Sequence, residues 1–150
     1  MQLVLYQLLT HPDAATSQQV LARERNKYGW APLHILANGK DAHGLRAGMI
    51  SLLVKHGADV EAVRGKADMT PLMMACASGH LDAAHALMTC GADPTAANRD
   101  GTTCWDLARK NSSAMVHVLE DVGAAMGKGT TGDGRFIEEN FLLMRRKARQ

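Results

Sequence analysis

The chain has 150 residues, of which 46% are hydrophobic and 4% aromatic. This length fits one domain, and a core of Leu, Met, Val and Ala favours thin packed helices over a β-sandwich. A formal net charge of +2 is too small to indicate a nucleic-acid or membrane partner. No apolar run approaches the roughly 18 residues of a membrane span, and residues 1–9 lack the features of a signal peptide.

Three cysteines make an odd count, and all three stand where packing positions are expected: Cys76, Cys90 and Cys104. Reduced thiols of this kind are typical of proteins in reducing compartments. With no signal peptide or transmembrane segment expected, we predict an intracellular protein, cytoplasmic or nuclear, that is monomeric on its own.

Residues 1–25 are expected to form an N-terminal cap built from a degenerate repeat. Leucines at positions 3, 5, 8 and 9 indicate a short apolar helix, and residues 14–25 indicate a second, inserted helix. His11-Pro12-Asp13 stands where the later units have Gly-Ala-Asp. Terminal units of a repeat array are usually atypical, because one of their faces has no neighbour.

Residues 26–62 form the first clear unit. Residues 26–30 predict a turn, and Pro32 suits the first position of an inner helix over residues 32–37. An outer helix is expected over residues 49–56, ending at Gly57. The connection between the two helices is rich in glycine and polar residues and carries an insertion within residues 38–48. We expect it to be a mobile surface loop.

Residues 63–97 carry the strongest start and stop signals. Thr70 can cap an inner helix that begins at Pro71, and Gly79 can end it in the left-handed conformation. A second helix is expected over residues 81–89, with its apolar side chains facing inward: Leu81, Ala84, Leu87 and Met88. Gly-Ala-Asp-Pro at residues 91–94 closes the unit.

Residues 98–123 repeat this pattern more weakly. Thr103 keeps the helix start, but Cys104 and Trp105 stand in the places of Pro and Leu. Residues 111–113 take the place of the glycine turn, and the outer helix is expected over residues 116–122. A repeat near the end of a stack is expected to depart from the pattern and to carry more polar residues.

The remaining residues divide into a linker and a helix. Residues 124–134 have the glycine-rich composition of a flexible linker, and residues 135–150 predict an amphipathic helix that ends in the basic run Arg145–Arg149. This helix has three open roles: a C-terminal cap, an apolar surface for another protein, or attachment to a membrane surface. The basic run could also contact nucleic acid.

Three helix starts align, at Ala31-Pro32-Leu33-His34, Thr70-Pro71-Leu72-Met73 and Thr103-Cys104-Trp105-Asp106. They lie 39 and 33 residues apart, and 33 is the ankyrin period. With Ala75, Gly79-His80 and Gly91-Ala92-Asp93 also matching, the chain resembles the ankyrin repeat family. The longer first interval reflects the insertion in residues 38–48 and one extra residue within 61–69.

The resemblance implies an all-α ankyrin-repeat solenoid with finger β-turns, degenerate capping ends and three repeats: 26–62, 63–97 and 98–123. It also implies a structural role for His34, which holds the family's histidine position and would tie neighbouring repeats together. His80, in the glycine turn, is expected to be structural as well. Asp68 stands where the family has glycine, which leaves the shape of the second finger open.

The family implies a non-catalytic protein-protein interaction module, such as a scaffold, adaptor or inhibitor, whose partner lies on a concave face. The matching exposed positions here are Lys27, Tyr28, Trp30, Asn38, Lys66, Ala67, Met69, Ala77, Ser78, Arg99, Asp100, Thr102 and Lys110. Tyr28 and Trp30 stand out, because aromatic side chains often dominate interfaces. The alternative for Trp30 is packing over the inserted loop. The alternative function is a regulatory module whose basic C-terminal helix engages a membrane or nucleic acid.

Three kinds of chemical site are not expected. A metal site at Cys76, His80, His85 and Cys90 lacks the paired spacing of zinc ligands. Residues 127–130, Gly-Lys-Gly-Thr, fail the spacing of a phosphate-binding loop. Cys104 with His117 and Asp106 supplies nucleophile chemistry without a recognisable motif. We therefore expect no catalytic residue, no cofactor and no metal.

Overall fold

The computed structural model describes residues 23–39, 45–65 and 67–125. Three predicted features lie wholly or mostly outside these ranges: the N-terminal cap, the glycine-rich linker and the C-terminal basic helix. Of the loop predicted within residues 38–48, residues 40–44 lie outside them. Lys66 lies outside them as well.

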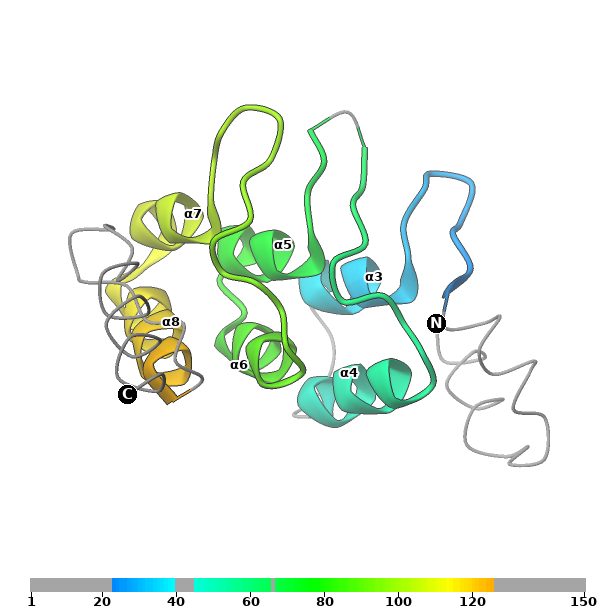
Figure 1. The fold of residues 1–150 in the computed structure, drawn as a ribbon, viewed down its shortest axis with the longest axis horizontal. Coiled ribbons are helices and arrows are strands. Elements are labelled where there is room, and N and C mark those ends of the chain that lie inside the picture. The colour runs from blue at the N-terminus through cyan, green and yellow to red at the C-terminus, as the bar shows by residue number, and fades with distance from the viewer. Residues whose placement is uncertain (1–22, 40–44, 66, 126–150) are drawn as a thin grey trace, which may run out of the picture.

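The described residues form six helices in three successive pairs. The pairs are α3 (Pro32–Asn38) with α4 (Arg46–Lys55), α5 (Pro71–Ser78) with α6 (Leu81–Thr89), and α7 (Cys104–Asn111) with α8 (Ser113–Ala125). The inner helices α3, α5 and α7 lie side by side in one row, and the outer helices α4, α6 and α8 form a second row (Figure 1). Loops project from the inner row in the direction away from the outer row (Figure 1). The predicted all-α stack of helix pairs is confirmed.

The middle pair has the bounds that its sequence signals predict. The Thr70 hydroxyl accepts a hydrogen bond from the Met73 N–H at 3.3 Å, which caps α5. Gly79 ends this helix with φ at +77°, and its N–H donates to the Ala75 carbonyl. That left-handed conformation costs little only for glycine, so the glycine turn is a backbone requirement.

The outer helix of the first pair begins earlier than predicted, at Arg46 instead of residue 49. Arg46 is buried, and its guanidinium donates to the Gly39 carbonyl at 2.5 Å and to the Asp82 carboxylate at 3.1 Å. The side chain thus joins the first turn of α4 to the end of α3 and to α6. These distant partners account for a helix start that the local sequence does not indicate.

The last outer helix also begins earlier than predicted, at Ser113 instead of residue 116. Ser112 is the cause, because its hydroxyl accepts a hydrogen bond from the Met115 N–H at 3.2 Å. The preceding residue, Asn111, is the last of α7, and its amide donates to the carbonyls of Cys76 at 3.2 Å and Ala77 at 2.8 Å. The predicted three-residue turn is therefore shorter and ties α7 to the end of α5.

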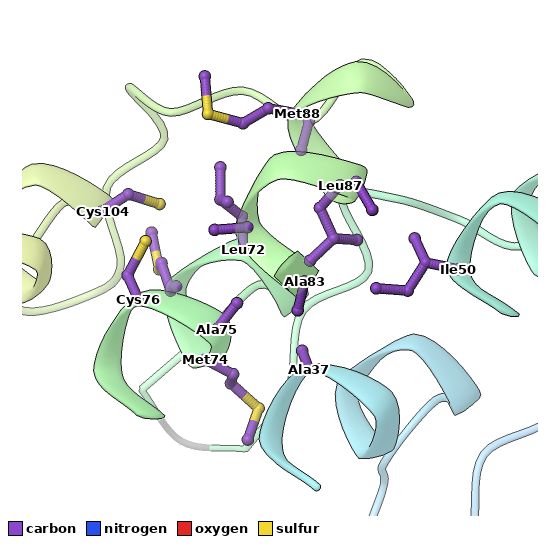
Figure 2. Packing of buried hydrophobic residues seen from close by; sticks show 14 of the residues in the cluster. Ala37, Ile50, Leu72, Met74, Ala75, Cys76, Ala83, Leu87, Met88 and Cys104 are labelled. Atoms are coloured by element: carbon purple, nitrogen blue, oxygen red, sulfur yellow. The ribbon is translucent and has the colours of Figure 1, made fainter. Parts of the chain in front are cut away.

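One continuous apolar core runs through the stack, with side chains from neighbouring pairs in contact (Figure 2). Cys104 and Trp105, which depart from the repeat pattern, are both buried and belong to this core. The predicted inward position of Leu81 is wrong, since 38% of its surface is exposed. The buried arc of α6 centres on Ala83 and Leu87, and Leu81 lies outside it.

Candidate protein-binding surface

The first and third fingers, residues 26–30 and 98–102, are built around the same asparagine turn. The Asn26 side-chain oxygen accepts hydrogen bonds from the N–H groups of Tyr28 at 2.9 Å and Trp30 at 3.0 Å. Asn98 repeats the arrangement with Asp100 at 3.0 Å and Thr102 at 2.8 Å. In both fingers the asparagine stands five residues before the helix cap, a recurrence that the sequence analysis missed.

The second finger, residues 64–69, is one residue longer and has Arg64 in the place of the asparagine. Its ends are held by two backbone hydrogen bonds of 3.0 Å between Arg64 and Met69. Asp68 adopts the left-handed conformation with φ at +52°, as the only non-glycine residue to do so in the described part of the chain. Its carboxylate accepts a hydrogen bond from Arg99 at 2.6 Å, which links this finger to the third.

Each finger also contacts the next one through the residue that precedes its helix cap. The Arg64 guanidinium lies 3.6 Å from the centre of the Trp30 ring. At the next step of the stack, the Asn98 amide approaches the Met69 sulfur at 3.7 Å. Trp30 is therefore half-buried against the second finger. These contacts hold the three fingers in register.

His34 has the structural role that the resemblance implies. Its side chain is fully buried; Nδ1 accepts from the Ala31 N–H at 3.3 Å and Nε2 donates to the Met69 carbonyl at 3.0 Å. This pattern requires the neutral imidazole with its proton on Nε2. Burial is the main cause that lowers the pKa of His34, and the positive charges of Arg25 and Arg64 lower it further. His80 contributes through its main chain, donating to Ala75 and accepting from Ala84.

Most of the predicted contact residues belong to the fingers or to the inner helices, which together form one side of the stack (Figure 1). Tyr28 at the first finger tip is 68% exposed, with the Lys27 ammonium 5.0 Å from the centre of its ring. On the inner helices, the Ser78 hydroxyl donates to the Asn38 side chain at 3.0 Å. The remaining exposed positions are Ala77, Arg99, Asp100 and Lys110, and the half-buried ones are Ala67, Met69 and Thr102.

The three residues considered for nucleophilic chemistry have separate roles. A hydrogen bond with Cys76, together with burial, raises the pKa of the Cys104 thiol well above its usual value. A thiol of this kind is a poor nucleophile at neutral pH, and the two side chains lie together in the core (Figure 2). Asp106 completes the capping box of α7 with Thr103, whereas His117 pairs with Glu120 on α8.

Within the ranges that the structure describes, no cluster of three or more histidine, cysteine, aspartate or glutamate side chains has the geometry to hold a metal ion. The described helices also include none whose length and apolar character would let it cross a bilayer.

The family profile of ankyrin repeats in three copies matches this chain over residues 3–98 and again over residues 42–127. The chain belongs to the ankyrin repeat family. This ankyrin-repeat chain is 39% identical to human protein phosphatase 1 regulatory subunit 27 over 84 residues, which cover 56% of the chain and 49% of that protein. The mouse protein of the same name is 39% identical over 71 residues, covering 47% of the chain and 46% of the relative.

A third similarity is to an enzyme, the palmitoyltransferase Hip14 of Drosophila melanogaster. The identity is 41% over 59 residues, which are 39% of this chain and 9% of that protein. The ankyrin-repeat chain thus matches a small part of the fly enzyme and about half the length of the two phosphatase regulatory subunits.

Proposed function

We propose that this chain is a non-catalytic recognition module that binds a partner protein through the face formed by the three fingers and by α3, α5 and α7. The observation that carries the proposal is a row of fingers that are held by hydrogen bonds and mutual contacts and carry exposed side chains. The fingers are fixed by Asn26 and Asn98 and by contacts to their neighbours, while Tyr28 at the tip is 68% exposed. A preorganised surface loses less entropy on binding.

Its role is regulatory rather than enzymatic in this proposal. Two of the relatives bear the name of a phosphatase regulatory subunit, and the similarity to the palmitoyltransferase is limited to 9% of that protein. The similarity to the regulatory subunits makes protein phosphatase 1 the first partner to test. The unpaired thiols of Cys76, Cys90 and Cys104 are consistent with an intracellular location.

The test is affinity measurement between the 150-residue chain and purified protein phosphatase 1, followed by proximity labelling to find other partners. Tyr28→Ala should weaken binding by roughly tenfold or more, because buried interface tyrosines are typical hot spots. Leu45→Ala is the matched control, since Leu45 is also 68% exposed but precedes the outer helix α4. Equal effects of the two substitutions on every partner found would contradict the proposed face.

A further inference from the structure

We propose that the first two fingers form a site for an acidic segment of the partner protein, in which Arg64 binds an aspartate or glutamate carboxylate. This inference rests on the proposed function, because it assigns the partner chemistry of the same face. It is carried by the first position of the fingers, where the second finger has an arginine and the other two have an asparagine.

Comparison of the repeats shows that the side chain of Arg64 has no part in closing its own turn, which its main chain closes with Met69. At the equivalent positions, Asn26 and Asn98 use their side-chain oxygens to accept two backbone N–H groups each. Arginine has no acceptor and cannot form that turn. Among its described residues, the second finger is closed by backbone hydrogen bonds, and the guanidinium lies 3.6 Å from the centre of the Trp30 ring. Stacking fixes the orientation of the charged group without neutralising it.

The Arg64 guanidinium is also under-bonded. Its Nε has no hydrogen-bond partner among the described residues, and the contact of Nη1 is a 4.0 Å approach to the Met74 sulfur, a weak acceptor. Two described arginines do have carboxylate partners, Arg46 with Asp82 and Arg99 with Asp68. Within the described part of the chain, Arg64 has no such ion pair. A carboxylate of the partner would give the terminal nitrogens of the guanidinium, rather than the buried Nε, a charge-assisted acceptor.

The surroundings of Arg64 are positively charged. Arg25 is held between the first two fingers, where Nη1 donates to the Val63 carbonyl at 2.6 Å and to the Gly29 carbonyl at 3.3 Å. Lys27 extends over Tyr28 at the first finger tip. The nearby carboxylate of Asp68 is already paired with Arg99. The positive charges of Arg25 and Arg64 both act on the buried ring of His34 and lower its pKa.

The experiment begins with peptides displayed as a random library and selected on the full 150-residue chain. We expect the selected sequences to be enriched in aspartate and glutamate. A fluorescently labelled acidic peptide and its matched copy with every acid replaced by its amide are then compared by anisotropy. The acidic peptide should bind at least about tenfold more tightly, and the difference should decrease as salt is raised.

Variants then locate the carboxylate. Arg64→Gln should remove most of the preference for the acidic peptide, and Arg64→Lys should restore only part of it, because lysine lacks the planar fork. Lys55→Gln removes the same charge from an exposed position on α4 and should change affinity by less than about twofold. Thermal unfolding of each variant checks that the stack remains folded.

Several outcomes would overturn the inference. Equal binding of the acidic and amide peptides, equal effects of Arg64→Gln and Lys55→Gln, or tighter binding of an RNA oligonucleotide than of the acidic peptide would each do so. If partners bind the finger face without any preference for acids, this inference fails and the proposed function stands. If no peptide or protein binds to the finger face, both the inference and the proposed function fail.

Discussion

At the scale of single residues, the stack depends on side chains that link one repeat to the next. His34 is the clearest case, because its two nitrogens join the start of α3 to the finger of the following repeat. The hydrogen bond to Ala31 is buried and the one to Met69 is partly buried, so losing the His34 side chain leaves polar groups with little access to water. Residues of this kind affect stability far more than their exposed neighbours do.

Replacing His34 with glutamine should lower the free energy of unfolding by about 1–3 kcal/mol, the usual cost of leaving buried polar groups unsatisfied. Urea denaturation at pH 7.5 measures this cost. The control is His85→Gln, an exposed position on α6, which should change the stability by less than about 0.5 kcal/mol.

His34 should also make stability depend on pH. Its pKa in the folded chain is lowered from 6.5, chiefly by burial, so below that value the unfolded chain binds the proton more readily. The free energy of unfolding is therefore not reduced by His34 above pH 6.5, where the residue is neutral in both states. It should decrease as the pH falls below 6.5. Urea denaturation at several pH values between 7.5 and 5.5 gives the free energy of unfolding as a function of pH. This free energy should change less with pH for His34→Gln than for the unsubstituted chain. Identical slopes would mean that His34 is not the titrating group.

Gly79 offers a comparison between two glycines that share a conformation. Gly79 and Gly101 have φ values of +77° and +74°, so alanine should cost about 1–2 kcal/mol at either position. At Gly79 the new Cβ would also lie 3.1 Å from the Asn111 side chain, whereas nothing lies within 4 Å at Gly101. Gly79→Ala should therefore be the more destabilising substitution in chemical denaturation. The reverse order would argue against the contact between α5 and α7.

At the scale of elements, the sequence predicts helices well where their start and stop signals are local. The bounds of α6 and the start of α5 follow from Thr70, Pro71, Gly79 and the closing glycine. The start of α4 could not be predicted, because Arg46 is positioned by the Gly39 carbonyl and by Asp82, which is 36 residues away. Ser112 did carry a local signal as a helix cap, but the pattern of the other repeats favoured a longer turn.

We expect the two partners of the Arg46–Asp82 ion pair to contribute unequally to the stability of the chain. Arg46→Ala should destabilise the chain by about 2 kcal/mol, because the arginine side chain is only 6% exposed and holds two acceptors. Asp82→Asn should cost less than about 1 kcal/mol, since the Asp82 side chain is 46% exposed and solvent screens the pair. Equal losses in urea denaturation would show that the ion pair, rather than the bond to Gly39, determines the stability.

At the scale of the whole molecule, the helix pairs form one core, and each pair covers the apolar side of its neighbour. Among the three described pairs, the middle pair forms an interface with each of the other two. A large cavity at the centre should therefore weaken the entire described stack and not only one repeat.

Leucines on the same helix test this dependence. Leu87→Ala removes a fully buried side chain of α6 and should cost about 2–5 kcal/mol. Leu81→Ala on the same helix, at a position that is 38% exposed, should cost less than about 1 kcal/mol. Circular dichroism during thermal unfolding should show one lowered transition for Leu87→Ala. An unchanged midpoint would contradict the continuous core.

The candidate surface is less predictable from sequence than the fold. The family pattern identifies which positions face outward, and Tyr28 is indeed exposed at a finger tip. It does not reveal that Trp30 stacks on Arg64 or that Asp68 pairs with Arg99, because these contacts join fingers more than 30 residues apart. Comparing the three fingers would have shown that Asn, Arg and Asn alternate at one position, but not what the arginine contacts.

Hydrogen exchange of the chain, free and bound to its partner, tests the central claim most directly, because it maps the bound surface without a substitution. We predict that amides of the fingers, residues 26–30, 64–69 and 98–102, exchange more slowly in the complex. Amides of the outer helices α4, α6 and α8 should exchange at similar rates in both states. Protection confined to the outer helices, with the fingers unchanged, would contradict recognition through the finger face.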